Sequence, residues 1–148
     1  MMAQKTVLSE IQVTLDVIGG KWKPLILHYL ENNGTRRYSE ILRYLETAPK
    51  KTLTAQLKEL EAAGIISRNV IPTVPVQVEY AVTAHGRTLF PILDVMCSWG
   101  YINGKGYDIK HRTCEYSEAT KQVKEERLRK LSQLYAADHH PTNQGTSK

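Results

Sequence analysis

The feature that most constrains the fold is a leucine-striped segment followed directly by two runs of apolar residues, all between residues 50 and 82. Leu53, Leu57 and Leu60 recur at steps of four and three residues, which places them on one side of an α-helix. Gly64 then supplies the backbone freedom that a left-handed helix cap needs. The segment therefore predicts a short amphipathic helix whose leucine side faces a core.

Two β-type runs follow this helix. Residues 65–71 read IISRNVI and are rich in β-branched side chains, while residues 76–82 read VQVEYAV and alternate along the strand. Between them lies PTVP, whose prolines have no backbone N–H and cannot join a strand ladder. We therefore predict a β-hairpin with a stiff, weakly hydrogen-bonded tip.

Taken by itself, this segment fits an ordinary helix and hairpin as well as it fits the second helix and wing of a winged helix-turn-helix. The residues upstream decide between these two structures. A short helix is expected over residues 40–46, EILRYLE, with Ser39 as its N-cap. Only Thr47 and Ala48 separate it from Pro49, which suits the first position of the next helix. Two short helices in sequence, the second basic at its start, predict a helix-turn-helix with the hairpin as its wing.

The face of the second helix opposite the leucines carries Lys51, Ala55, Lys58 and Ala62. Small and cationic side chains suit close approach to an anionic duplex groove, and the first turns of a recognition helix meet base edges in the major groove. The predicted contacts from this helix are Lys50, Lys51, Thr52, Thr54, Gln56 and Lys58. Contacts to the DNA backbone are predicted from Arg36, Arg37, Ser39 and Arg68, with Thr73 at the wing tip near the minor groove.

The charge distribution supports this reading. The formal net charge is +5 and the pI about 9.2, which solubility alone could explain. Between Lys21 and Arg68, however, nine Lys and Arg residues stand against five Glu, a surplus of four. A protein-interaction module that never touches DNA is the alternative, and the basic outer face argues against it.

The remaining helices indicate a dimer. A first helix is expected from Ser9 to Ile18, stopped by two glycines, and a second over residues 21–32. Thr83 is expected to cap a helix running through Arg87 to about Gly104. This last helix is apolar nearly all round, so it must be buried on several sides, and a partner copy would cover it. The predicted interface residues are Leu15, Trp22, Leu89, Leu93, Met96, Trp99 and Gly100.

The chain is one domain's worth at 148 residues, and its 41% hydrophobic and 24% charged content is that of a soluble globular protein. Mainly α structure with a small hairpin wing (α+β) is expected. The predicted parts are a flexible arm (1–8), the winged domain with dimerisation helices (9–104), an extension with a Ser117-capped helix (105–136) and a disordered tail (137–148). Neither a membrane span nor a signal peptide is recognisable, so we expect a cytoplasmic protein.

The candidate chemistry of the chain is sparse. Two cysteines are too few for a disulfide scaffold; Cys97, in an apolar pattern, is predicted to be a buried small hydrophobe, and Cys114 the reactive thiol. His111 and Cys114 have the separation of two metal ligands, but no second pair completes a site. Gly19-Gly20-Lys21 lacks the spacing of a phosphate loop. We therefore expect no enzyme, no metal and no cofactor.

A binding site for a small ligand between the winged domain and the dimer helices stays an open alternative. Its lining would be Trp22, Tyr29, Met96 and Trp99.

Taken together, these segments resemble the HxlR family of bacterial winged-helix transcriptional regulators. The matching phrases cover about Leu15 to Gly100 and read LDVIGGKWKPLILHYL, RRYSEI, KTLTAQLKELEAAGII, PTVPVQVEYAVTAHGRTL and LDVMCSWG. The resemblance implies a homodimer on double-stranded operator DNA, with recognition helices in successive major grooves and wings at the flanks. We predict a repressor on a pseudo-palindromic operator.

The chain departs from this family at one position. Many redox-sensing members carry a cysteine ahead of the first helix, and the register here points to Ser9 and Glu10. Serine forms no thiolate, so a thiol switch is not available at this position. Sensing of a redox effector through Cys97 or Cys114, or of a different small molecule, stays open.

Overall fold

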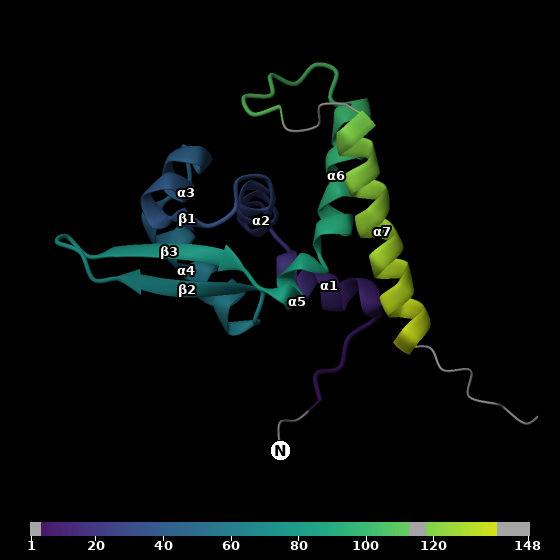
Figure 1. Ribbon diagram of the computed structural model, residues 1–148, viewed down its shortest axis with the longest axis horizontal. Coiled ribbons are helices and arrows are strands. Elements are labelled where there is room, and N and C mark those ends of the chain that lie inside the picture. The colour runs from purple at the N-terminus through teal and green to yellow at the C-terminus, as the bar shows by residue number, and fades with distance from the viewer. Residues whose placement is uncertain (1–3, 113–117, 139–148) are drawn as a thin grey trace, which may run out of the picture. The chain divides into compact units, whose positions relative to one another are not determined.

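The computed structural model describes residues 4–112 and 118–138, and it is mainly helical with one small antiparallel sheet (Figure 1). The chain divides into two compact units, residues 1–89 and 90–148. A helix-turn-helix followed by a β-hairpin lies in the first unit, which confirms the predicted fold class. Among the described residues, no helix has the length and apolar character to cross a membrane.

Helices α1 (Glu10–Ile18) and α2 (Trp22–Asn33) lie where the sequence predicts them. The α1 helix ends at Gly19, whose N–H donates to the Leu15 carbonyl oxygen at 2.6 Å. A Cβ atom on Gly19 would lie 2.3 Å from that oxygen, so the close turn requires glycine.

Helix α3 (Tyr38–Leu45) begins earlier than predicted, and the assignment of Ser39 as its N-cap is wrong. The capping position is Arg37, whose backbone N–H donates to Glu40 Oε1 at 3.2 Å. A glutamate at the third helical position thus satisfies a backbone donor that a serine cap would have left free. Ser39 consequently lies inside the first turn.

Helix α4 (Lys50–Ala62) is the second helix of the helix-turn-helix. Leu53, Leu57 and Leu60 are at most 1% exposed, which confirms the predicted buried stripe. Pro49 is the N-cap and not the first helical residue, and its carbonyl accepts the Leu53 N–H at 2.9 Å. Gly64 has a φ of +73°, as predicted for the residue that ends this helix.

The sheet has the order β1-β3-β2 with both pairs antiparallel. Strand β1 (Arg36–Arg37) is short, and β2 (Ile66–Ile71) and β3 (Gln77–Val82) form the predicted hairpin within one residue at each end. The register places Arg36 and Arg68 on either side of Tyr80. Two cationic residues far apart in sequence therefore flank one buried tyrosine.

The core of the first unit joins the helices to the sheet. Its most buried side chains come from α2, α3, α4 and the start of β2, and they are Ile26, Leu27, Ile41, Leu53, Leu57, Leu60, Ile65 and Ile66. Together they pack the helix-turn-helix against the base of the hairpin.

The single helix predicted after the wing is wrong, because the chain forms α5 (Ala84–Arg87) and α6 (Phe90–Asn103). Pro91 lacks an N–H, and in a continuous helix its ring would clash with the carbonyl of Arg87. Thr83 does cap α5, since its Oγ1 accepts the Gly86 N–H at 3.0 Å.

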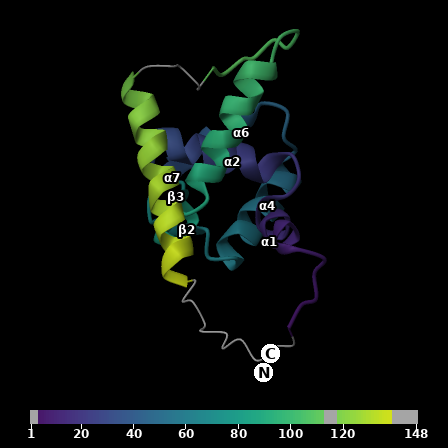
Figure 2. The same cartoon turned by 90° about the vertical axis from the view of Figure 1, so that its right-hand side faces the viewer.

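In the second unit, α6 and α7 (Glu118–Asp138) run side by side (Figure 1 and Figure 2). Arg127 of α7 donates from Nη1 to both carboxylate oxygens of the buried Asp94, at 3.3 and 3.2 Å. Its guanidinium also lies 5.2 Å from the centre of the Phe90 ring. The predicted cap Ser117 and residues 139–148 of the predicted tail lie outside the described residues.

Candidate nucleic-acid interface

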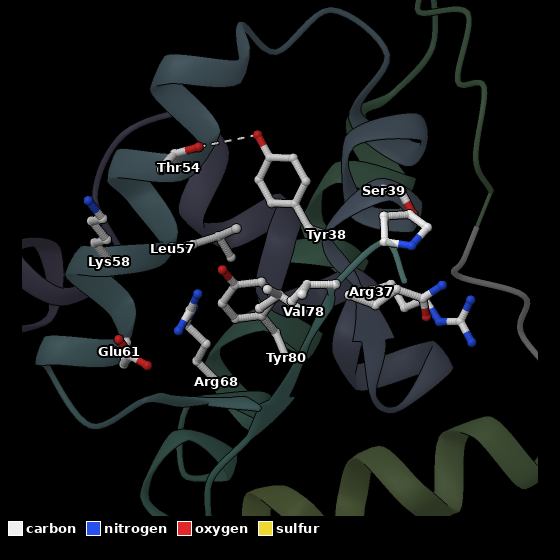
Figure 3. Close-up of a pocket in the computed structure, with 13 residues that line it drawn as sticks. Arg37, Tyr38, Ser39, Thr54, Leu57, Lys58, Glu61, Arg68, Val78 and Tyr80 are labelled. Atoms are coloured by element: carbon white, nitrogen blue, oxygen red, sulfur yellow. Dashed lines mark hydrogen bonds between the residues drawn. The ribbon is translucent and has the colours of Figure 1, made fainter. Parts of the chain in front are cut away.

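A groove lies between α4, the first turn of α3 and the wing (Figure 3). Its volume is about 740 Å³. The side chains that line it are Arg37, Tyr38, Ser39, Thr54, Leu57, Lys58, Glu61, Arg68, Pro75, Val76, Gln77, Val78 and Tyr80. Three elements that are separate in sequence thus form one concave surface.

The groove is cationic at its edges and apolar at its floor. Figure 3 shows Lys58 and Arg68 on one side and Arg37 with Ser39 on the other. Leu57 and Val78 lie between them, and Glu61 is the one acidic residue among the lining residues. Three positive charges against one negative charge favour a polyanion such as a nucleic-acid backbone.

The solvent face of α4 continues this surface. Lys50, Lys51, Thr54 and Lys58 are exposed, whereas Thr52 and Gln56 are half-buried. A residue step of 100° puts Thr54 and Lys58 toward the wing, with Thr52 and Gln56 on the side away from it. The six predicted contacts from this helix therefore do not share one face.

Tyr38 fixes the start of the recognition helix. Its hydroxyl donates to the Lys50 carbonyl oxygen at 3.3 Å and lies 3.2 Å from Thr54 Oγ1, which can donate to it in turn (Figure 3). Because Thr54 is held in this way, its hydroxyl is oriented before any partner arrives. The first turn of α4 is thereby pre-organised.

A second contact fixes α4 from its other side. Lys23 Nζ, at the start of α2, lies 2.5 Å from Glu59 Oε2, and the Lys23 side chain is only 10% exposed. This ion pair offsets the negative charge of Glu59, an acid on the same helix as Lys51 and Lys58.

The cations outside α4 differ in their availability. Arg36 donates to the Thr35 carbonyl oxygen at 2.9 Å and lies 3.6 Å from Glu40. Arg37 and Arg68 are exposed and line the groove. The structure therefore brings Arg37 and Arg68 together with Lys58, while part of the charge of Arg36 is offset by Glu40.

The wing tip is apolar. No Lys or Arg lies between residues 69 and 86, and Val74 is fully exposed. Thr73 uses its hydroxyl internally, donating to the Pro75 carbonyl oxygen at 2.9 Å. The tip is thus a structured apolar projection beside a cationic groove.

The predicted dimer residues occupy different environments. Leu15, Met96 and Trp99 are exposed, Trp22, Leu89 and Gly100 are half-buried, and Leu93 is buried within the single chain.

The predicted ligand-site residue Tyr29 stacks on Tyr44, with ring centres 4.3 Å apart and planes 11° apart. The described residues include no group of three His, Cys, Asp or Glu side chains suited to holding a metal ion.

The expectation that Cys97 is a buried small hydrophobe is wrong, because Cys97 is half-buried and disulfide-bonded. It lies one helical turn after the buried Leu93 and lines a cavity. Cys114, the predicted reactive thiol, lies outside the described residues.

Several groove residues were not predicted from the sequence. Tyr38 precedes the helix expected over residues 40–46, Glu61 lies in a predicted helix with no role assigned to it, and Tyr80 is one of four alternating apolar positions. The register that sets Tyr80 between two arginines joins residues 12 and 44 positions apart. Only the alternation of VQVEYAV could have indicated that Tyr80 faces inward.

Comparison with known proteins gives consistent matches. A family model described as HxlR-like helix-turn-helix matches residues 17–108. An uncharacterized HTH-type transcriptional regulator of Methanothermobacter thermautotrophicus is 43% identical over 103 residues, which cover 70% of this chain and 78% of that protein. The regulator YtcD of Bacillus subtilis is 46% identical over 99 residues, 67% of this chain and 78% of YtcD.

Solved structures agree with these matches. The redox regulator HypR in its oxidized form is 42% identical with a TM-score of 0.61, covering 68% of this chain and 100% of that chain. The crystal structure of the HTH-type regulator ytcD gives 46% identity and a TM-score of 0.61, covering 65% and 97%. The reduced form of YodB from B. subtilis is 30% identical with a TM-score of 0.56, covering 70% and 100%.

Proposed function

Because this chain belongs to the HxlR family of helix-turn-helix transcriptional regulators, we propose that it is a homodimeric repressor that binds a pseudo-palindromic operator. The family and its relatives make it a DNA-binding regulator and not an enzyme. A regulator of this kind acts where the DNA is, so we place it in the cytoplasm.

The observation that carries the proposal is the continuity between the outer face of α4 and the cationic groove. Lys51 and Thr54 lie on the part of α4 that would enter a major groove, where they could reach base edges. Lys58, Arg68 and Arg37 would hold the phosphates of the adjoining strand. The apolar wing tip would then meet the minor groove through sugar contacts and not through charge.

The proposed dimer rests on an exposed apolar face of α6. Val95, Trp99 and Ile102 recur at steps of four and three residues and are all more than half exposed, with Met96 beside them. A contiguous apolar face of this kind on a soluble chain marks an interaction site. A second copy is the partner that a two-fold operator requires, because half-site symmetry mirrors protein symmetry.

The test is binding of the purified protein to its own upstream intergenic DNA, compared with a scrambled duplex, across a salt series. We expect tight, salt-sensitive binding to the native fragment and much weaker binding to the scrambled one. Equal, weak binding to both duplexes that vanishes at moderate salt would overturn the proposal and favour a protein-interaction module. A reporter under that upstream region should rise when the gene is deleted if the protein represses.

We also propose a redox effector that acts through Cys97. Disulfides are uncommon in reducing compartments and are usually transient or redox-sensing there. The similar redox regulator HypR has been solved in an oxidized and a reduced form. Oxidation would convert two thiols to a disulfide and pass two electrons and two protons to the oxidant. Diamide and dithiothreitol should then change operator affinity in opposite directions, and Cys97→Ser should remove the response.

A further inference from the structure

We infer that the second unit holds a binding cavity for a small planar aromatic acid, separate from the DNA-binding surface. The cavity has a volume of about 430 Å³ and lies between the C-terminal half of α6 and residues 104–112. The residues that matter for the argument are Trp99, Gly100, Tyr101, Tyr107, His111 and Arg112. All of them lie within residues 90–112, so the site belongs to one unit.

The cavity is formed by a loop that turns back onto the helix. After α6 ends at Asn103, the Tyr107 N–H donates to the Gly104 carbonyl oxygen at 3.1 Å, and Gly106 has a φ of +91°. A Cβ on Gly104 would lie 2.7 Å from the Gly100 carbonyl oxygen and 3.3 Å from Ile109 Cδ1. Glycine at position 104 therefore permits the close return of the loop, and the cavity is built before a ligand arrives.

The chemistry of the walls favours a flat apolar ligand. Trp99, Tyr101 and Tyr107 contribute three aromatic rings, and aromatic faces hold planar rings by stacking or edge contact. Gly100 leaves the helix surface bare at the floor, since a Cβ there would meet nothing within 4 Å. The volume falls in the range of small-molecule sites, about 300–1,000 Å³.

The lining also offers a cationic partner for an acid. Arg112 is the cation and Asp108 the acid among the lining residues, and Lys105 and Lys110 lie in the same loop, so residues 104–112 carry three cations against one acid. Arg112 and His111 line the cavity, and a guanidinium matches the two oxygens of a carboxylate. A planar aromatic carboxylate therefore fits both the aromatic walls and this cation.

The experiment uses the full chain without reductant, so that the disulfide at Cys97 is kept, and 2-naphthoate as the probe. In a Trp22→Phe background Trp99 is the only tryptophan, and its fluorescence reports on the cavity wall directly. The neutral isostere 2-naphthamide tests the need for the acid. Binding is measured without DNA, so its outcome is independent of the proposed function; only an effect of the ligand on operator affinity would rest on that proposal.

Position 100 offers a matched pair of variants. Gly100→Ala adds one methyl to open space and favours the helix, whereas Gly100→Leu adds a side chain large enough to fill the cavity. Both are checked for equal helical content and equal oligomeric state. Arg112→Gln tests the contribution of the cation.

We expect saturable quenching of Trp99 by 2-naphthoate, at least tenfold tighter binding than of 2-naphthamide, and no more than a twofold change in Gly100→Ala. Gly100→Leu should lose binding at least tenfold, and Arg112→Gln should remove the preference for the acid. Equal binding by the Leu and Ala variants would overturn the site. So would the absence of saturable quenching at millimolar probe in the parent protein.

Discussion

At the scale of single residues, the two cations on one side of the groove, Lys58 on α4 and Arg68 on β2, are predicted to contact phosphates. Each contact releases about one counterion, so Lys58→Ala or Arg68→Ala should lower the salt slope of DNA binding by about one unit per protomer. The measurement is operator affinity against salt concentration. Arg129→Ala removes the same charge from an exposed site on α7 and should leave the slope unchanged.

The wing tip should affect the strength of DNA binding but not its salt slope. Val74 is fully exposed and carries no charge, so Val74→Ser should weaken operator binding through lost apolar contact while the salt slope stays the same. Val74→Lys should raise the slope by about one unit per protomer and strengthen binding to any duplex. An unchanged affinity in both variants would show that the tip does not reach the DNA.

We expect Tyr44 to make the free energy of unfolding depend on pH in the alkaline range. Burial, and then the negative charge that Tyr29 carries when ionised, raise the pKa of Tyr44 above its ordinary value of 10.0. Between that value and the raised one, Tyr44 ionises in the unfolded chain and not in the folded one, so its contribution to the free energy of unfolding falls as pH rises. Tyr44→Phe should therefore lose less stability between pH 9 and 11 than the parent protein. Urea midpoints measure this, with Tyr135→Phe on α7 as the exposed control.

At the scale of elements, α7 is held against α6 by a buried ion pair. Asp94 is 5% exposed at its side chain and Arg127 is 29% exposed. Arg127→Met leaves a buried carboxylate without this partner, which should cost about 2–3 kcal/mol, less than the figure for fully buried pairs because Arg127 is partly solvated. Amide exchange should accelerate along α7. Asp94→Asn combined with Arg127→Met should recover part of the loss, while Arg129→Met in the same helix should change little.

The elements that local patterns determine are the ones the sequence predicts well. The stripe of Leu53, Leu57 and Leu60, the cap at Gly64 and the alternation of residues 76–82 each depend on neighbours within a few residues. The break before α6 also follows from the sequence, because Pro91 cannot continue a helix from Arg87. The long apolar pattern around it favours a continuous helix, so the two local signals conflict there.

The groove depends on contacts that no local pattern carries. Tyr38 meets Lys50 and Thr54 across 12 and 16 residues, and Arg68 meets the groove only through the β2–β3 register. Helix periodicity puts Thr52 and Gln56 on a different side of α4 from Lys51, but it does not determine which side meets the wing. Tertiary packing determines that.

At the scale of the whole molecule, one protomer offers one recognition helix, and a lone helix-turn-helix reads only a short half-site. Two copies related by a two-fold axis would place two recognition helices about 34–36 Å apart, one turn of DNA. Affinity for the full operator then depends on the interface between copies, since the second half-site is bound at high effective concentration.

Val95→Glu tests this dependence. Val95 is 57% exposed on the apolar face of α6, so the glutamate costs the folded protomer little, but in a two-fold interface it would bury a charge near its symmetry mate. We expect a monomer in sedimentation and at least tenfold weaker binding to the full operator, with half-site binding retained. Val123→Glu makes the same change at a 49% exposed position on α7 and should keep the dimer. If Val95→Glu remained a dimer with full operator affinity, the α6 face would not be the interface, and the exposed apolar residues of α1, among them Ile11 and Leu15, would be tested next.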